Sequence, residues 1–222
     1  EIQSHVLHVY FLAAPDALGA GSVLPLASSH PEVVKRALRM KKVGNVICDA
    51  VAGRHVHPIA LVPGGFTHVP SKKDLKKVQD YILMLNDDVD ATVETVAAIG
   101  GAFPKFERER EDVSLTHPDE YAFYNGQLKS SKTGVHDIHD YAKVIHEFCV
   151  EHSTSKHVRN VDACLAVGAL SRFNNNAAQL NDRGQAAAKK LGLKAPCYNP
   201  YYNNLAQTVE IAHFYDEAVK LM

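Results

Sequence analysis

Apolar residues recur every three or four positions over three long stretches of the chain, a pattern that predicts helices. In residues 2–13 the apolar side chains surround the helix axis, so we expect a helix that is buried on most sides. The second stretch predicts a long helix over about residues 30–52. The third begins after Ser71 and continues as one unbroken apolar stripe to Gly100. Helices of this length in a chain of this size indicate a helical bundle.

Residues that start or stop helices supply the expected boundaries. Pro15 should end the first helix, because proline lacks the backbone N–H that a helix interior requires. Residues 16–27 then read as a loop. Ser29 and Glu32 have the spacing of a capping box at the start of the second helix, and Gly53 is its expected C-terminal stop.

The pattern becomes strand-like in the middle of the chain. Asn125-Gly126 lies between short strand-like arms in residues 120–131, which predicts an antiparallel hairpin. Residues 55–61 could add a third strand. Because an isolated strand pair is only marginally stable, we expect this sheet to rest on the helical bundle.

Helical spacing returns towards the C-terminus. It predicts a helix over about residues 138–151, a helical rhythm through residues 162–192, and a last helix from about Asn203. No internal repeat and no shift in composition divides the chain. The predicted fold is therefore mainly α, a long-helix bundle with a small antiparallel β-sheet or hairpin, in a single domain covering residues 1–222.

Composition excludes several classes of function. The net charge is −1 with histidines neutral, which argues against binding to nucleic acid or to an acidic membrane surface. No apolar run reaches the roughly 18 residues that would suggest a membrane span. The cysteines form no CxxC pair, so free thiols in a reducing, cytoplasmic compartment are expected. They are Cys48, Cys149, Cys164 and Cys197.

The segment GRHVHPIALVPGG at residues 53–65 is stiff and carries two histidines. In a strand, His55 and His57 would point to the same face and could share a metal. A usable site needs three or four ligands, and the sequence indicates no nearby Cys, Asp or Glu. Hydrogen-bonded or interface histidines are therefore favoured over a metal site. The residues that fix the shape of the segment, or let another chain approach it, are Pro58, Pro63, Gly64 and Gly65.

Other polar residues give weaker signals. His5 and His8 lack the glutamate of an HExxH motif, and we interpret them as polar positions on a helix face. For Arg172 a structural ion pair is favoured over contact with a partner. Residues 174–176 (Asn-Asn-Asn) are typical of capping and hydrogen bonding near a helix start. The nucleophile elbow, the P-loop and the dinucleotide fingerprint are absent, so no catalytic residue is assigned.

Six stretches together resemble the large subunit of soluble nickel–iron hydrogenases, in particular the group that passes electrons to a viologen, F420 or heterodisulfide-type acceptor. They occur in the family's order and extend over nearly the whole chain. The six stretches are QSHVLHVYFLAAPD at 3–16, GRHVHPIALVPGG at 53–65, DEYAFYNGQL at 119–128, HSTSKHVRN at 152–160, VGALSRFN at 167–174 and LAQTVEIAHFYDE at 205–217.

One departure from the family pattern bears on activity. The resemblance implies a nickel–iron centre held by two CxxC pairs, one near each end of the full subunit, and neither pair is present here. None of the four cysteines matches a ligand position. With no initiator methionine and helical periodicity running into both ends, we expect an internal fragment of a longer large subunit. Such a fragment should bind no nickel and be inactive alone, whereas the intact complex would oxidise hydrogen or reduce protons.

The resemblance also implies a partner, the iron–sulfur small subunit. It places the histidine-bearing segment against that subunit, beside the electron path. The residues expected on this side are His55, His57, Pro58, Gly64, Gly65 and Arg172. A fragment without its partner should also self-associate. Two alternatives stay open, a metal-free redox-complex scaffold of the complex I quinone-site type and a stand-alone interaction module.

Overall fold

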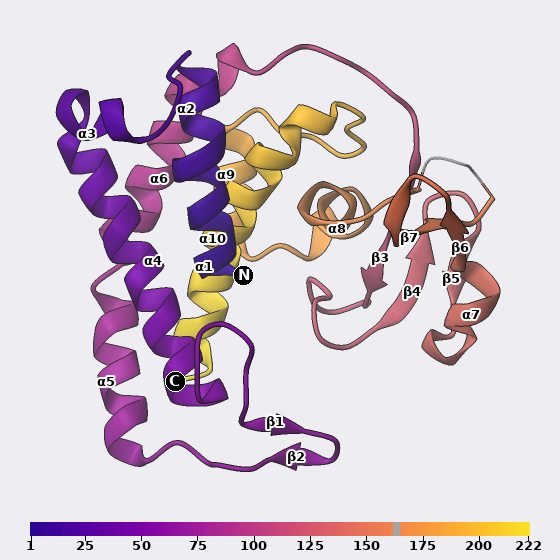
Figure 1. Cartoon of the computed structure of the whole chain (residues 1–222), viewed down its shortest axis with the longest axis horizontal. Coiled ribbons are helices and arrows are strands. Elements are labelled where there is room, and N and C mark those ends of the chain that lie inside the picture. Colours follow the sequence, from indigo (N-terminus) through magenta and orange to yellow (C-terminus); the bar gives the residue numbers. More distant parts are fainter. Residues whose placement is uncertain (162–164) are drawn as a thin grey trace. The chain divides into compact units, whose positions relative to one another are not determined.

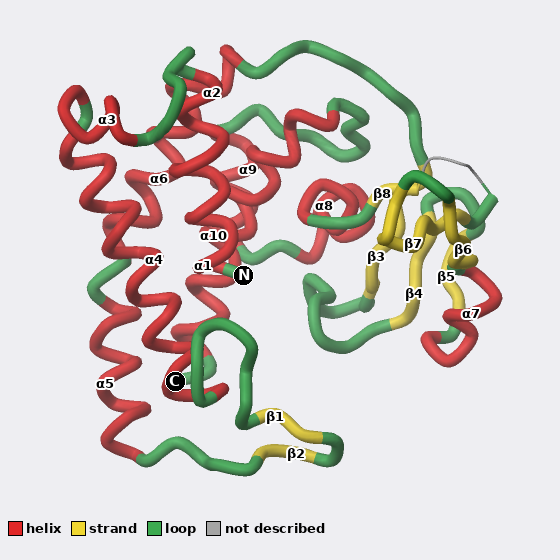
Figure 2. Tube along the Cα trace, in the orientation of Figure 1, coloured by secondary structure: helices red, strands yellow, loops and turns green. Residues whose placement is uncertain are grey.

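The computed structural model describes residues 1–161 and 165–222, which divide into two compact units (Figure 1). The first unit comprises Glu1–Phe103 together with Gln207–Met222, and the second comprises Pro104–Ala206. Helices predominate and the strands are short, as Figure 2 shows, so the predicted mainly α class with small sheets is confirmed. The single domain over residues 1–222 stays a prediction.

The first unit is a helical bundle with one short hairpin. Its helical elements are α1 (Ile2–Leu7), the π-helical η1 (His8–Ala13), α2 (Ala14–Ala17), α3 (Leu24–Ser29), α4 (Pro31–Ala52), α5 (Lys72–Leu83), α6 (Asn86–Ile99), η2 (Gly100–Ala102) and most of α10 (Asn203–Lys220). Among the described residues, no helix combines the length and the apolar character needed to cross a bilayer.

The prediction that Pro15 ends the first helix is wrong. Helical structure continues to Ala17, because the π-helical turn of η1 restarts the hydrogen-bonding pattern and Pro15 then occupies the first turn of α2. In a first turn the missing N–H has no intrahelical partner to lose. The loop expected over residues 16–27 is correspondingly shorter, since α3 begins at Leu24.

Helix α4 matches the predicted helix over residues 30–52. Gly53 follows it in the left-handed conformation, with φ of 80°, as a C-terminal glycine should. The predicted capping box is wrong, because the N-cap is His30 and no side chain caps the helix. The Ser29 hydroxyl instead donates to the Pro25 carbonyl, and the Glu32 carboxylate accepts from Lys35.

Close approach to α1 fixes the position of α4. A Cβ added at Gly44 would lie 2.6 Å from Gln3 Cβ and 3.0 Å from Gln3 Cα, so the two backbones touch here. Met40 and Val43 on the same face of α4 are buried. Glycine at this position therefore permits a helix contact that no other residue allows without movement.

The prediction of one unbroken third helix is wrong, because the apolar stripe is divided between α5 and α6. Ser71 starts α5 as predicted, since its Oγ accepts the Asp74 N–H at 3.1 Å. At the break the Leu85 N–H donates to the Ile82 carbonyl, which ends the first helix with a tighter turn. Asp88, in the first turn of α6, accepts Arg39 Nε at 2.7 Å.

The second unit carries a four-stranded sheet in the order β5–β4–β3–β8. Its strands are β3 (Glu111–Thr116), β4 (Gln127–Ser130), β5 (Gly134–His136) and β8 (Leu165–Ala166). All neighbours are antiparallel except β8, which runs parallel to β3. The core of the sheet contains Val113, Leu128 and Val144.

The hairpin predicted at Asn125-Gly126 is correct in pairing and wrong in its first arm. Strand β4 pairs with residues 113–116 of β3 rather than with residues 120–124, so Asn125-Gly126 ends a longer connection. Gly126 has φ of 141°, and an added Cβ would lie 2.5 Å from the Thr116 carbonyl oxygen. This contact, rather than a two-residue turn, is what requires glycine.

The helix predicted over residues 138–151 is also wrong. Only η3 (Ile138–Asp140) and α7 (Tyr141–Val144) are helical, and β6 (His146–Val150) then pairs with β7 (Ser153–Arg159). The Phe148 ring lies edge-on to His157 and under the Arg159 guanidinium. These cross-strand contacts favour the strand over the helix that local spacing suggested.

The helical rhythm through residues 162–192 is interrupted, and residues 162–164 lie outside the described part of the chain. The helical elements that follow β8 are α8 (Ala169–Asn176), η4 (Ala177–Gln179), α9 (Asp182–Lys190) and η5 (Pro200–Tyr202). A new helix begins at Asn181, because its side chain caps the N-terminus of α9 by accepting the Gly184 N–H at 2.9 Å.

The asparagines at 174–176 end α8 rather than start a helix. Their predicted hydrogen-bonding role is confirmed. Asn174 donates to Asp112, and Asn175 donates to Ser114 Oγ at 2.9 Å. Asn176 donates to the Leu115 carbonyl. They therefore hold α8 against β3.

Candidate functional site

A surface excursion connects α4 to α5 and contains five of the six residues that the sequence marks as an interface. Its base is closed by backbone bonds, because the Ile59 and Ala60 N–H groups both donate to the Ala52 carbonyl at 3.0 Å. The Thr67 N–H in turn donates to Ala60. Ala60 is buried, so the excursion is anchored in the bundle at this point.

Beyond the base, β1 (Leu61–Val62) and β2 (Gly65–Phe66) form a two-stranded antiparallel hairpin. The possible third strand over residues 55–61 is therefore wrong, because Leu61 pairs with Phe66 and not with the sheet of the second unit. Gly64 and Gly65 have φ of 88° and 151°, and a Cβ added to either would meet nothing within 4 Å. The turn needs glycine for its backbone conformation alone.

The two histidines lie in bends rather than in a strand, and both are exposed. His55 Nδ1 lies 2.8 Å from Asp49 Oδ1, a carboxylate one helical turn before Gly53 that the sequence analysis missed. His57 is the one described non-glycine residue with positive φ, at 55°. Strain of this kind is often associated with functional surfaces. Pro58 follows it and is also exposed.

The excursion exposes an apolar surface, which we call the hairpin patch. Its residues, all exposed, are Val56, Ile59, Leu61, Val62, Phe66 and Val69. A two-stranded hairpin has no side chains of its own that could bury its two faces. Several exposed apolar residues on one segment are typical of a contact with another chain.

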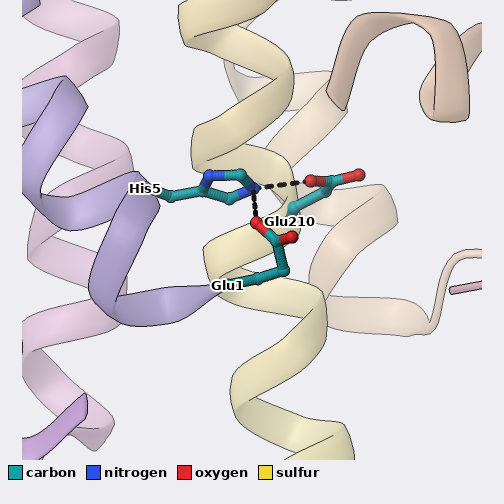
Figure 3. A group of neighbouring side chains, drawn as sticks. All are labelled: Glu1, His5 and Glu210. Carbon is teal, nitrogen blue, oxygen red and sulfur yellow. Dashed lines mark hydrogen bonds and ion pairs between the residues drawn. The ribbon is translucent and has the colours of Figure 1, made fainter. Parts of the chain in front are cut away.

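A second group of residues comes together inside the first unit. Glu1, His5 on α1 and Glu210 on α10 point towards one another (Figure 3). His5 Nε2 lies 2.7 Å from one Glu210 oxygen and 3.2 Å from one Glu1 oxygen. His8 Nδ1, at the start of η1, contacts Oε1 of Gln207 on α10 at 2.6 Å.

His5 is a polar position on a face of α1, and that face is buried. His5 is 4% exposed and Glu210 is fully buried, because α10 covers this face of α1. One signal in the sequence was available. Glu210 interrupts an apolar helical run between Val209 and Ile211, and a charged residue there requires a polar partner.

The comparisons with known proteins agree with the fold. No protein-family model matches the chain. Over its whole length, the chain is 33% identical to the alpha chain of sulfhydrogenase 1 from Pyrococcus furiosus and covers 52% of it. It is 25% identical to a component of the F420-non-reducing hydrogenase vhu from Methanococcus voltae, again over its whole length, and covers 58% of it. The chain is homologous to hydrogenase large subunits.

A solved structure shares this fold. With a TM-score of 0.83 and 20% identity, 99% of the chain matches 55% of a chain in the crystal structure of an NAD+-reducing NiFe-hydrogenase in the H2-reduced state. The beta chain of the NAD-reducing hydrogenase HoxS from Cupriavidus necator is 22% identical over 96% of the chain. The chain spans about half the length of the curated relatives it matches.

The cysteines of this hydrogenase homologue do not form a thiolate-rich metal site in the described part of the chain. Cys48 on α4 belongs to the first unit, whereas Cys149 on β6 and Cys197 belong to the second. Burial raises the pKa of the Cys197 thiol, which disfavours a thiolate. Cys164 lies outside the described residues. Possible metal ligands come close together at one place in residues 1–161 and 165–222, where Glu1, His5 and Glu210 meet. These residues do not fit a thiolate-held nickel–iron centre.

Arg172, the sixth predicted interface residue, lies on α8 of the second unit. Its guanidinium carbon is 5.2 Å from the centroid of the Phe123 ring, a cation–π contact. Both side chains line a cavity of about 390 Å³ beside β3, together with Leu115 and Val167. The expected ion pair at Arg172 stays a prediction.

Proposed function

We propose that the chain is the middle part of the catalytic subunit of a nickel-dependent hydrogenase, which oxidises hydrogen or reduces protons in the intact complex. In this proposal the nickel–iron centre is held by parts of the subunit other than residues 1–222. The homology to hydrogenase large subunits, of which the chain covers about half, supports this assignment. Because residues 1–222 contain no CxxC pair, the proposal assigns the metal-binding thiolates to other parts of the subunit.

Within that subunit the chain acts as scaffold and as the surface that receives an iron–sulfur small subunit. The observation that carries this role is the hairpin patch. It is an exposed apolar surface on an excursion whose base is closed by backbone hydrogen bonds, and it includes the sequence neighbours of the strained residue His57. The combination of exposed aliphatic and aromatic side chains with the exposed His55 and His57 on one segment is typical of a subunit interface.

The test of this role replaces His57 with alanine in the intact complex and measures hydrogen-dependent viologen reduction and co-purification of the small subunit. We expect loss of small subunit, of turnover, or of both. His139→Ala is the matched control, because His139 is exposed on η3 of the other unit. Unchanged assembly and turnover in His57→Ala would refute the interface role.

Inactivity of the isolated chain is tested separately. After expression under conditions that load nickel into hydrogenases, elemental analysis should find no stoichiometric nickel, and hydrogen should not reduce viologen. Stoichiometric nickel or turnover would contradict the proposal. The isolated chain should also self-associate through the hairpin patch, so light scattering should give a mass above the 24.3 kDa of one chain. A monomer at high concentration would argue against this.

The alternative is a metal-free scaffold of the complex I quinone-site type. The one observation that favours it is the absence of CxxC pairs in the sequence. The parent reading frame distinguishes the two. Paired cysteines coded before Glu1 and after Met222 support the hydrogenase, and a complete frame without them supports the scaffold.

A further inference from the structure

An apolar cavity lies inside the first unit, at the end of the bundle where α2, α3, α4 and α6 come together (Figure 1). Its volume is about 250 Å³. Most of its lining is aliphatic, from residues such as Leu18, Val33, Ala37 and Ile99. Folded interiors normally leave few voids larger than a water molecule, so a space of this size indicates a binding site rather than ordinary packing.

The polar groups inside the cavity are already hydrogen-bonded to the protein. The Tyr10 hydroxyl, on η1, donates to Thr92 Oγ1 at 2.9 Å. Thr95 Oγ1 donates to the Ala91 carbonyl at 2.7 Å and accepts from Arg36 Nη1 at 2.9 Å. A buried water needs two to four polar partners. The interior of the cavity therefore favours an apolar ligand over water.

The volume sets the size of that ligand. An engineered cavity of about 150 Å³ with apolar walls binds benzene, whereas pockets for drug-sized ligands have volumes of about 300–1,000 Å³. In proportion to the benzene cavity, 250 Å³ holds a compact molecule of about ten non-hydrogen atoms. This is the size of a fused two-ring aromatic compound.

His30 lies at the opening of the cavity, since it lines the cavity and is exposed. Its Nδ1 lies 2.9 Å from Ser29 Oγ, and its Nε2 makes no hydrogen bond in residues 1–161 and 165–222. An imidazole nitrogen can donate to, or accept from, one hydroxyl group. A ligand with one hydrogen-bonding group at its end therefore fits better than a pure hydrocarbon.

Helix α3 is the part of the wall that can open. All six of its described residues, Leu24–Ser29, are at least partly exposed, although Leu26 lines the cavity. The loop before the helix contains Gly19 and Gly21, and a Cβ added at either position would meet nothing within 4 Å. A segment with so little packing to lose opens at low cost and gives the ligand a way in.

We propose that this cavity binds one neutral, compact apolar molecule of the size of a fused two-ring aromatic compound, with a hydroxyl or carbonyl group at His30. Aliphatic side chains of α2, α4 and α6 enclose the rings, α3 closes over them, and His30 Nε2 bonds the polar group. The site is independent of the function proposed above, because the ligand is far larger than dihydrogen and its binding is measured without turnover.

The experiment titrates 2-naphthol into the chain and follows the naphthol fluorescence and the heat of binding. The chain has no tryptophan, so the background emission is low. We expect one saturable site per chain, a negative heat-capacity change and displacement by naphthalene. Naphthalene should bind about 2- to 10-fold more weakly than 2-naphthol, which corresponds to the loss of one hydrogen bond. His30→Leu should remove this difference.

Variants that fill the cavity test its location. Ala37→Leu fills it from α4 and should weaken 2-naphthol binding at least tenfold. Ala98→Leu fills it from α6 and keeps the test decisive if Ala37→Leu fails to fold, because Ala98 is exposed whereas Ala37 is buried. Ala27→Leu is the matched control. It adds the same atoms to an exposed position of α3 outside the lining, and should leave binding unchanged.

Four outcomes would overturn the site. They are no saturable binding, unchanged affinity in the folded Ala37→Leu and Ala98→Leu variants, equal loss of affinity in Ala27→Leu, and binding by this chain that is absent from the full-length parent subunit. In the last case another part of the subunit would fill the cavity. A preference for 2-naphthol that persists in His30→Leu would refute the hydrogen bond at the opening.

Discussion

Replacing Gly44 with alanine tests whether direct backbone contact between α1 and α4 stabilises the bundle. The new methyl group would lie 2.6 Å from Gln3 Cβ and 3.0 Å from Gln3 Cα. Carbon atoms in favourable contact are about 3.5–4.0 Å apart, so the helices must separate by about 1 Å. Neither obstructing atom belongs to the flexible end of a side chain, so rotamer changes cannot relieve the clash.

The magnitude follows from two opposing effects. Overpacking of this kind costs about 1–3 kcal/mol, and the absence of a flexible neighbour places Gly44→Ala near the upper end. Alanine in a helix interior is favoured over glycine by about 1 kcal/mol. The variant should therefore lose about 2 kcal/mol of unfolding free energy. For a chain of this size that corresponds to a decrease of about 4–8 °C in the melting temperature.

The assay is urea unfolding followed by circular dichroism, with a thermal melt as a second measurement. Gly101→Ala is the matched control, since a Cβ there meets nothing within 4 Å and its φ is not positive. It should be neutral or slightly stabilising. A double variant that adds Gln3→Gly removes the closest atom and should recover part of the loss. A Gly44→Ala chain as stable as wild type would refute the inferred helix contact.

Three further predictions concern single residues. Asn181→Ala removes the side chain that accepts the Gly184 N–H at the start of α9, and should lower the unfolding free energy by about 1 kcal/mol in urea titrations; no change would show that the cap is dispensable. Gly126→Ala should reduce stability more than Asn181→Ala does, because it combines φ of 141° with a Cβ only 2.5 Å from the Thr116 carbonyl; equal urea midpoints would contradict this. Burial lowers the pKa of His213 below its ordinary value of 6.5, so the unfolded chain binds the proton more strongly. Stability should fall as pH decreases from about 6.5 towards the lowered pKa, and His213→Gln should reduce this slope; an unchanged slope would refute it.

Local signals in the sequence predicted several boundaries well. Gly53 ends α4 because the left-handed conformation suits glycine, and Ser71 starts α5 because its hydroxyl accepts a free N–H. Both effects depend on neighbours within three or four residues. The apolar periodicity likewise predicted the last helix, and α10 is buried on most sides between Leu205 and Tyr215.

The wrong predictions are explained by interactions between residues that are distant in sequence. Residues 146–150 have helical spacing, yet pairing with residues 153–159 makes them a strand. The apolar stripe through Leu85 is continuous in the sequence, yet the helix is interrupted there. Asp88 then pairs with Arg39. His5 and Glu210 are 205 positions apart, and no local pattern links them. Within the candidate interface the sequence predicted the exposed histidines, and it missed Asp49 beside His55 because that residue lies in the preceding helix.

The discontinuity of the first unit has a consequence for biosynthesis. Residues 104–206 are a continuous segment, whereas the first unit needs residues 207–222 to be complete. During translation, α1 leaves the ribosome well before α10, which carries Glu210 and the rest of its cover. The second unit can collapse while the first is still unfinished, so the buried face of α1 depends on chaperones, or on transient contacts, until α10 has been synthesised.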